Sequence, residues 1–358
     1  MAFAEQLHPS PLPEAPSTSL PAPAPPSYVR RLRMQPHLYS TICKARLFYS
    51  RRIAGAGARR TFRRNPSLFR LSALETKQVE SLRCNGFSLA ENFVPKDMVD
   101  RLYARADAMF RDLRIDFDRA YSVQTGQRRS LQGLSYEELA ASEKMIALAD
   151  PLLHIPKLLD VAFDERILKI AANFLRGVPP LYRVTVVRDF PHNRPLHSSN
   201  FHKDNDESDS LQIFIYLVDI DDSRGPLVYV PESNRYDVRS CRPRLSRDMG
   251  LPGNDGRLSD EEVERVYPCS EWVVLRTGRG SLAAIHGNGI HKGPAWPRPD
   301  DSANRPRTAI KLDLHGHKSG VARAGNENRI WRRDYERMSE LQRLFAHPTQ
   351  VDDAQGQT

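Results

Sequence analysis

The stretch LQIFIYLVDI (Leu211–Ile220) is almost continuous in apolar residues, and β-branched and aromatic side chains dominate it. Such a composition favours a buried β-strand. Five further stretches of this kind lie after Gly177, and turns rich in Pro, Gly, Asp and Asn separate them. They cover residues 181–190, 226–230, 271–276, 280–286 and 307–315. The second half of the chain is therefore predicted to be a cluster of short antiparallel strands.

Helical patterns dominate the part of the chain before this cluster. A short strand is expected at 86–94, and Pro95 opens a helix with apolar residues every three or four positions. Ser135 and Glu138 form a capping-box pattern, and a further helix over 165–176 ends at Gly177. A last amphipathic helix is expected over 330–345. We therefore predict an α+β fold with N-terminal helices packed on a β-sandwich or barrel and a helix at the C-terminus.

The formal charge of +9 resides in the N-terminal extension. No acidic residue lies between Glu14 and Glu75, whereas the chain from Glu75 onward is close to neutral. We predict a disordered, proline-rich segment at 1–27 and a basic, partly helical arm at 28–74. The arm is expected to pack on the body with a solvated basic face; contact with an anionic surface and organelle targeting are the alternatives. The main domain is then 75–320, followed by a C-terminal helix and polar tail at 321–358.

Composition excludes several classes of protein. The four cysteines, Cys43, Cys84, Cys241 and Cys269, lie too far apart for a zinc ribbon or a disulfide framework. No apolar run reaches the roughly 20 residues that a membrane-spanning helix needs. The near-neutral body argues against nucleic acid as a partner. We expect a cytoplasmic enzyme that acts on a small molecule.

A candidate metal site lies in SSNFHKDNDES (Ser198–Ser208), where His202 and Asp204 are two residues apart. Roughly one His-x-Asp pair is expected by chance in a chain of this composition, so the pair needs support from its context. Residues i and i+2 of a strand share a face, which lets both side chains reach one ion. His291 in HGNGIHKG is the candidate third ligand, and His286 is the alternative. Two histidines and one carboxylate are typical of non-haem Fe(II) oxygenases.

The runs SSNFHKDND, LQIFIYLVDIDDSRGPLVYVPESN, GRGSLAAIHGNGIHKG and NRPRTAIKL together resemble the phytanoyl-CoA dioxygenase family. This family comprises oxygenases that depend on Fe(II) and 2-oxoglutarate, and the resemblance extends from about Glu75 to His315. It implies a double-stranded β-helix, a jelly-roll or cupin-like core. It also implies Fe(II) as the metal and 2-oxoglutarate and O2 as co-substrates.

The resemblance also implies roles for individual residues. His202, Asp204 and His291 would bind the iron, and Arg307 would bind the distal carboxylate of 2-oxoglutarate. Ser199 and Gln212 fall where the family often has polar residues that line the pocket. The chain departs from the family at Gly293, where a serine often assists the arginine. The interval from His291 to Arg307 is also longer, and its prolines and Trp296 suggest a lid over the site.

The implied reaction is the oxidative decarboxylation of 2-oxoglutarate to succinate, coupled to hydroxylation of a small organic substrate. Desaturation and ring closure are related outcomes of the same chemistry. Two alternatives stay open at this point. One is a cupin-like metal enzyme that does not use 2-oxoglutarate and has no need of Arg307; the other is a non-catalytic β-barrel that serves as a binding module.

Overall fold

The computed structural model describes residues 55–122, 131, 133–192, 199–204, 210–234, 257–296, 301–315, 328–346 and 349–352. The predicted proline-rich segment at 1–27 and most of the predicted basic arm lie outside these residues, as does the polar end of the chain. The mixed helix and sheet architecture that the sequence predicts is confirmed.

Two sheets make up the body of the protein. The larger sheet has seven strands in the order β1-β8-β5-β10-β4-β3-β2, and all its neighbouring strands are antiparallel. These strands are β1 (Phe87–Ala90), β2 (Tyr121–Ser122), β3 (Glu143–Ala147), β4 (Leu181–Asp189), β5 (Ser210–Tyr216), β8 (Leu282–His286) and β10 (Arg307–His315). The smaller sheet has the order β7-β6-β9 and consists of β7 (Val273–Leu275), β6 (Leu227–Tyr229) and β9 (His291–Lys292).

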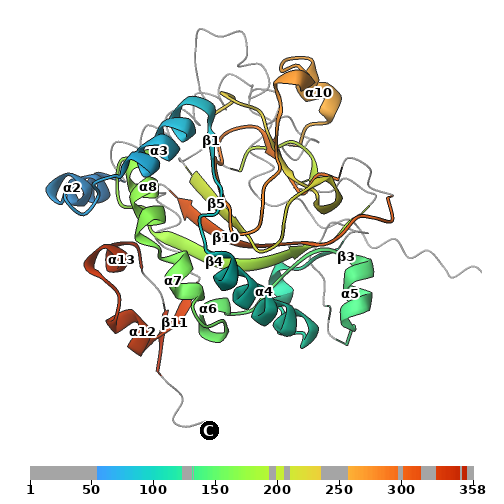
Figure 1. Ribbon diagram of the computed structural model, residues 1–358, viewed down its shortest axis with the longest axis horizontal. Helices are drawn as coiled ribbons and strands as arrows, with labels where there is room; N and C mark the ends of the chain where they lie inside the picture. Colours follow the sequence, from blue (N-terminus) through green and yellow to red (C-terminus); the bar gives the residue numbers. More distant parts are fainter. Residues whose placement is uncertain are drawn as a thin grey trace, which may run out of the picture.

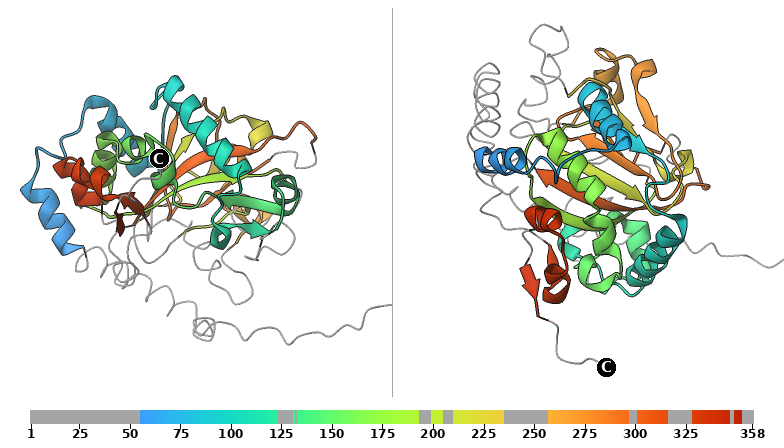
Figure 2. Two further views of the ribbon diagram at one scale, coloured as in Figure 1. Left: turned by 90° about the horizontal axis from the view of Figure 1, so that it is seen from below. Right: turned by 60° about the vertical axis from the view of Figure 1, so that its left-hand side comes forward.

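Helices from the first half of the chain cover one face of the larger sheet (Figures 1 and 2). Apolar side chains of α4 and α8 form one core cluster with the strand residues that point the same way, among them Ile213 and Ile310. The helices before the strand cluster are α2 (Ala56–Arg64), α3 (Ala73–Asn85), α4 (Lys96–Arg111), η3 (Phe117–Arg119), α5 (Tyr136–Ser142), α6 (Pro151–His154), α7 (Leu158–Ala162) and α8 (Glu165–Leu175).

A second core cluster lies between the two sheets. Alternate residues of β5 point there, so Phe214 and Tyr216 meet Leu227 and Tyr229 of β6. A third cluster covers the outer side of the smaller sheet, where Val228 packs against Val263 of α10 (Asp260–Glu264). The helices, the larger sheet and the smaller sheet therefore form successive layers. A ligand-binding site would lie in the interior between the two sheets. The short η5 (Asp222–Arg224) and η6 (Cys269–Glu271) connect its strands.

Reciprocal capping starts several helices, among them the one that the sequence predicts after Ser135. The Ser135 hydroxyl oxygen accepts a hydrogen bond from the Glu138 backbone N–H, and the Glu138 carboxylate accepts one from the Ser135 backbone N–H. The same reciprocal pair starts α3 at Ser72 and α10 at Ser259. The end of α8 differs from the prediction, because Arg176 rather than Gly177 adopts the left-handed C-cap conformation.

The C-terminal region corrects one expectation. The single helix predicted over 330–345 is β11 (Arg329–Trp331) followed by two short helices, α12 (Arg332–Glu336) and α13 (Glu340–Phe345). A capping box formed by Ser339 and Gln342 starts α13 as a separate helix. β11 pairs in parallel with β12 (Thr349–Val351).

The described part of the basic arm is helix α2. Its Phe62 ring lies 4.9 Å from that of Phe69, and Ala58 lies next to Gly177 at the end of α8. Arg60, Arg63 and Arg64 are exposed. Within α2, Ala58 and Phe62 pack against the body while these arginines face solvent. None of the described helices combines the length and the apolar character that a bilayer crossing requires.

The core packing yields a stability prediction. Ile310 is fully buried at the centre of β10, between Val186 and Ile215 on the neighbouring strands. Replacing it by alanine removes buried methyl groups and leaves a cavity, so Ile310→Ala should lower the free energy of unfolding by about 2–5 kcal/mol. Urea denaturation measures this change. Leu74→Ala is the control, because Leu74 is exposed and its loss should cost less than about 0.5 kcal/mol; equal losses would contradict the assigned core.

Candidate metal centre

Two segments that are far apart in sequence meet at His202 and His291. The His202 backbone N–H donates to the His291 carbonyl over 2.8 Å, and the His291 N–H donates to the His202 carbonyl over 3.0 Å. This reciprocal pair extends the smaller sheet by one bridge beyond β9. It also places the two imidazole rings side by side, with their centroids 4.4 Å apart.

Each imidazole is held by a backbone carbonyl from its own segment. His202 Nδ1 lies 2.9 Å from the Asn200 carbonyl oxygen, and His291 Nδ1 lies 2.9 Å from that of Gly289. A carbonyl oxygen can only accept, so both Nδ1 atoms carry the proton. In the neutral tautomer with this proton, Nε2 carries the lone pair, and this is the form of imidazole that binds a metal ion.

Asp204 completes the group. Its backbone N–H donates to the Gly287 carbonyl over 2.8 Å, which fixes the turn after His202 against the end of β8. Its carboxylate oxygens lie 3.5 Å from His202 Nε2 and 3.3 Å from His291 Nε2. Gly287 is required here, since a Cβ at that position would meet Ser210 Oγ and come within 3.1 Å of Asp204 Oδ2. The candidate ligand atoms all lie within 4.8 Å of one another.

The protonation states of the triad suit metal binding. Burial lowers the pKa of His202 to about 4, and the neighbouring His291 adds to this effect. Loss of solvent around the Asp204 carboxyl favours the neutral acid, but His291 and His202 outweigh it and lower the pKa of this carboxyl well below its usual range. At neutral pH the site therefore offers a neutral His202 imidazole and an ionised carboxylate, as a divalent cation requires.

The donor set fits an iron ion. Two imidazole nitrogens and one carboxylate that converge from one side leave further coordination positions for exogenous ligands, as in non-haem iron sites. The Asp204 side chain retains 22% exposure, so the triad can be reached from outside. The positions predicted for the three ligands are thus brought together by the fold.

His286, the alternative third ligand, points away from this group. It lies at the end of β8 on the helix-covered face, where its ring packs edge-on against Phe174 of α8 with centroids 5.1 Å apart. Its Nδ1 lies 3.2 Å from the Asn234 side chain. The expectation that His286 is structural and His291 joins His202 agrees with this geometry.

Arg307 lies at the start of β10 and is buried. Its Nε and Nη2 both donate to Asp189 Oδ2, over 3.0 and 2.8 Å, and its Nη1 donates to the Gly225 carbonyl over 3.0 Å. A Cβ at Gly293, two residues after His291, would lie 3.6 Å from the same Nη1. The guanidinium is therefore oriented by Asp189 and lies beside the segment that carries His291.

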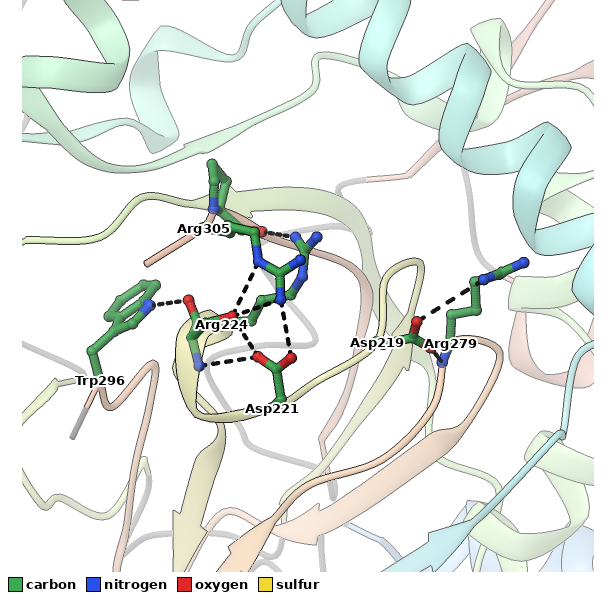
Figure 3. A network of polar contacts seen from close by, with 8 residues as sticks. Asp219, Asp221, Arg224, Arg279, Trp296 and Arg305 are labelled. Carbon is green, nitrogen blue, oxygen red and sulfur yellow. Dashed lines mark hydrogen bonds and ion pairs between the residues drawn. The ribbon is translucent and has the colours of Figure 1, made fainter. Parts of the chain in front are cut away.

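A network of polar contacts positions the chain just before Arg307 (Figure 3). Arg305 Nη2 donates to Asp221 Oδ2 over 3.0 Å and to Ser223 Oγ over 2.8 Å, and its backbone N–H donates to the Ser223 carbonyl over 2.7 Å. The Trp296 indole N–H donates to the same carbonyl over 3.0 Å. Arg224 from this turn reaches the Pro306 carbonyl. The proposed lid residue Trp296 is thus fixed to the turn before β6, and residues 297–300 lie outside the described part of the chain.

Gln212 and Ser199, the two remaining predicted site residues, lie in different parts of the structure. Gln212 is buried on β5, directly opposite Asp313, and shares the interior face of the sheet with Phe214. This places it in the interior layer. Ser199 Oγ lies instead 3.3 Å from His192 Nε2, and the His192 ring packs edge-on against Trp296. Ser199 is therefore connected to Trp296 only through the His192 ring.

Sequence reasoning missed Lys144. It lies on β3, is 2% exposed, and is close enough to Asp189 and Arg307 for their charges to act on it. Burial lowers the pKa of Lys144 to about 7, and the Asp189 carboxylate opposes this effect. The EKMIA segment begins with two charged residues and is short, so its sequence carries no clear strand signal.

A second charged group lies farther along the interior face of β10. The buried Asp313 accepts hydrogen bonds from Arg183 Nε and Nη2 over 3.0 and 2.9 Å, and Lys311 Nζ lies 3.5 Å from its other oxygen. Arg183 and Lys311 keep about a quarter of their side chains exposed. Strand alternation places this group on the same face as Gln212 and Phe214.

Several solved structures are similar to this chain at low sequence identity. They include the epimerase SnoN in complex with Fe3+, alpha ketoglutarate and nogalamycin RO (TM-score 0.47, 16% identity, 70% of this chain and 88% of that chain). EctD from S. alaskensis with 2-oxoglutarate and 5-hydroxyectoine gives a TM-score of 0.46 at 17% identity over 69% and 76% of the chains. AviO1 from Streptomyces viridochromogenes Tue57 gives 0.44 at 16% identity over 70% and 98%.

No curated protein matches the chain by sequence. The family model for phytanoyl-CoA dioxygenase, in contrast, matches residues 82–296. This span contains the triad, both β5 and β6, and more than half of the chain. The chain belongs to the phytanoyl-CoA dioxygenase family.

Proposed function

We propose that this protein is an Fe(II)- and 2-oxoglutarate-dependent oxygenase that hydroxylates a small organic substrate. One observation carries the proposal: His202 Nε2, His291 Nε2 and the Asp204 carboxylate converge within 4.8 Å, while both Nδ1 atoms are held by backbone carbonyls. Membership of the phytanoyl-CoA dioxygenase family supports it independently.

Iron(II) held by His202, Asp204 and His291 would supply dioxygen activation coupled to the oxidative decarboxylation of 2-oxoglutarate to succinate and CO2. The residues of the chain hold the ion in position and set the electrostatic charge of the site. Asp204 would neutralise one of the two positive charges of the ion. Because imidazole ligands are neutral, one positive charge would remain at the site, and this charge favours an anionic co-substrate. The fixed Nδ1 contacts hold both rings in one orientation.

Arg307 is proposed to bind the distal carboxylate of 2-oxoglutarate. Its guanidinium lies beside Gly293 and is held by Asp189, so it is oriented before any ligand arrives. A planar guanidinium can form two parallel hydrogen bonds with a carboxylate. Lys144 adds a further cationic group near Arg307.

The two facing sheets are proposed to form the double-stranded β-helix typical of such enzymes, with the described helices as its outer cover. The interior then binds both the co-substrate and the substrate, and Gln212 lies on its wall. The apolar side chains of Phe214 and Leu227 exclude water from it. The partly exposed Arg183 and Lys311 are proposed to face the substrate, while Ser199 supports the Trp296 segment over the site.

The ligand assignment predicts a clear difference between two histidines. His291→Ala should abolish stoichiometric iron binding, because it removes one of three donors from the triad. His286→Ala is the matched control and should retain iron, since His286 lies on the helix-covered face. The measurement is the iron content per chain after anaerobic loading and desalting. Loss of iron from His286→Ala together with its retention by His291→Ala would reverse the assignment.

The role of Arg307 predicts a second difference. Arg307→Lys keeps a cation beside Asp189 but cannot form the planar pair, so it should raise the KM for 2-oxoglutarate at least about tenfold in a succinate-release assay. Arg101→Ala is the control, because the contacts of Arg101, an exposed pair with Asp97 and one with Met98 Sδ, both lie within α4 and their loss should leave the rate unchanged. Unaltered kinetics in Arg307→Lys and Arg307→Ala would show that another group binds the distal carboxylate. An iron-loaded parent protein that releases no succinate would favour a metal enzyme that does not use 2-oxoglutarate.

A further inference from the structure

Tyr216 carries a buried hydroxyl group without a hydrogen-bond partner. The residue ends β5, its side chain is fully buried in the interior between the sheets, and no described residue accepts from or donates to its oxygen. An unpaired buried hydroxyl is costly, because the group has lost its hydrogen bonds to water. A ligand that pairs with this oxygen would explain why a tyrosine rather than a phenylalanine stands here.

The sheet register places Tyr216 next to the proposed carboxylate-binding arginine. Tyr216 lies directly opposite Ala309 on β10, and Arg307 is two residues farther along the same face. Asp189 lies opposite Arg307 on the other neighbouring strand. Diagonal neighbours on one face of a sheet are within reach of aromatic and long side chains. Tyr216 therefore lies diagonally next to the Arg307–Asp189 pair on the interior face of the sheet.

The phenol is suited to donate a hydrogen bond. Burial raises the pKa of Tyr216, and the charges of Arg307 and Asp189 act on it in opposite directions. The hydroxyl therefore keeps its proton at neutral pH and can serve as a donor to an anion.

The hydrogen bonds of Arg307 leave a role for another donor. Three of its five N–H groups are committed, two to Asp189 and one to the Gly225 carbonyl. The Asp189 carboxylate also offsets the charge of the guanidinium. Gly293, which lies beside Nη1, has no side chain to contribute. A carboxylate that arrives at Arg307 can accept about four hydrogen bonds, and only two guanidinium N–H groups remain for it.

We propose that the Tyr216 hydroxyl donates a hydrogen bond to the distal carboxylate of 2-oxoglutarate and, with Arg307, determines selectivity for a dicarboxylic 2-oxo acid. This inference rests on the proposed function. It predicts that the hydroxyl matters for the far end of the co-substrate and not for its 2-oxo acid end, which the metal would bind.

The test compares two ligands on the iron-loaded protein without oxygen. Calorimetric titration gives the Kd of 2-oxoglutarate and that of 2-oxobutanoate, which keeps the 2-oxo acid but lacks the distal carboxylate. Tyr216→Phe removes only the hydroxyl and should weaken 2-oxoglutarate binding by about 10- to 100-fold, since a hydrogen bond to a charged group is lost. It should leave the Kd of 2-oxobutanoate unchanged.

Urea denaturation and a second tyrosine serve as controls. Tyr216→Phe should leave the stability of the free protein unchanged or raised, because the hydroxyl has no partner to lose. Tyr136→Phe removes a hydroxyl that is paired with Arg188 over 2.7 Å on the helix side of the sheet. It should lower stability and leave the affinity for 2-oxoglutarate unchanged.

Two outcomes would overturn the inference, and they are distinguishable. If the parent protein prefers 2-oxoglutarate over 2-oxobutanoate and Tyr216→Phe keeps that preference, Tyr216 has no part in binding and the proposed function stands. If the parent protein binds 2-oxoglutarate no more tightly than 2-oxobutanoate, the 2-oxoglutarate assignment itself fails and the inference fails with it.

Discussion

The two backbone hydrogen bonds between His202 and His291 are the contact on which the rest of the site depends. They join segments 89 residues apart and fix both imidazoles with respect to each other. Asp204 follows from them, because its N–H must then reach the Gly287 carbonyl at the end of β8. The contact thus connects the smaller sheet to the larger one at the position of the triad. The backbone geometry thereby brings together three side chains, each of which would bind a metal ion only weakly alone.

The interior between the sheets carries more charge than a core designed only for stability would need. Arg307 and Asp189 form an ion pair with both side chains almost fully buried, and Asp313 lies buried against Arg183. Burying such pairs costs desolvation free energy that their attraction only partly returns. These groups are consistent with an interior that binds anionic ligands.

Much of the fold could be predicted from sequence because its signals are local. The strand over 307–315 has the predicted bounds, and the capping box at Ser135 starts a helix where expected. Local signals failed where tertiary contacts decide the structure. β3 begins with charged residues and is a strand because β4 pairs with it, and Ser339 divides the predicted C-terminal helix.

The same distinction between local signals and tertiary contacts applies to the candidate site. The spacing of His202 and Asp204, the order of His291 and Arg307 along the chain and the family resemblance together selected those four residues. His202 and Asp204 lie in an isolated bridge and the turn after it rather than in the strand that the spacing suggested. The choice between His286 and His291 was a matter of strand phase, which the register of β8 makes visible. The partner of Arg307, the unpaired hydroxyl of Tyr216 and the position of Lys144 depend on cross-strand neighbours. No periodicity in the sequence reports these neighbours.

The central claim is that one iron ion binds between the two sheets at the His202–His291 contact. A crystal structure of the iron-loaded protein with 2-oxoglutarate, grown without oxygen, tests it most directly. The account predicts a single metal ion bound by His202 Nε2, His291 Nε2 and the Asp204 carboxylate, with the distal carboxylate of 2-oxoglutarate at Arg307. A metal ion bound by other residues, or 2-oxoglutarate located away from Arg307, would contradict it.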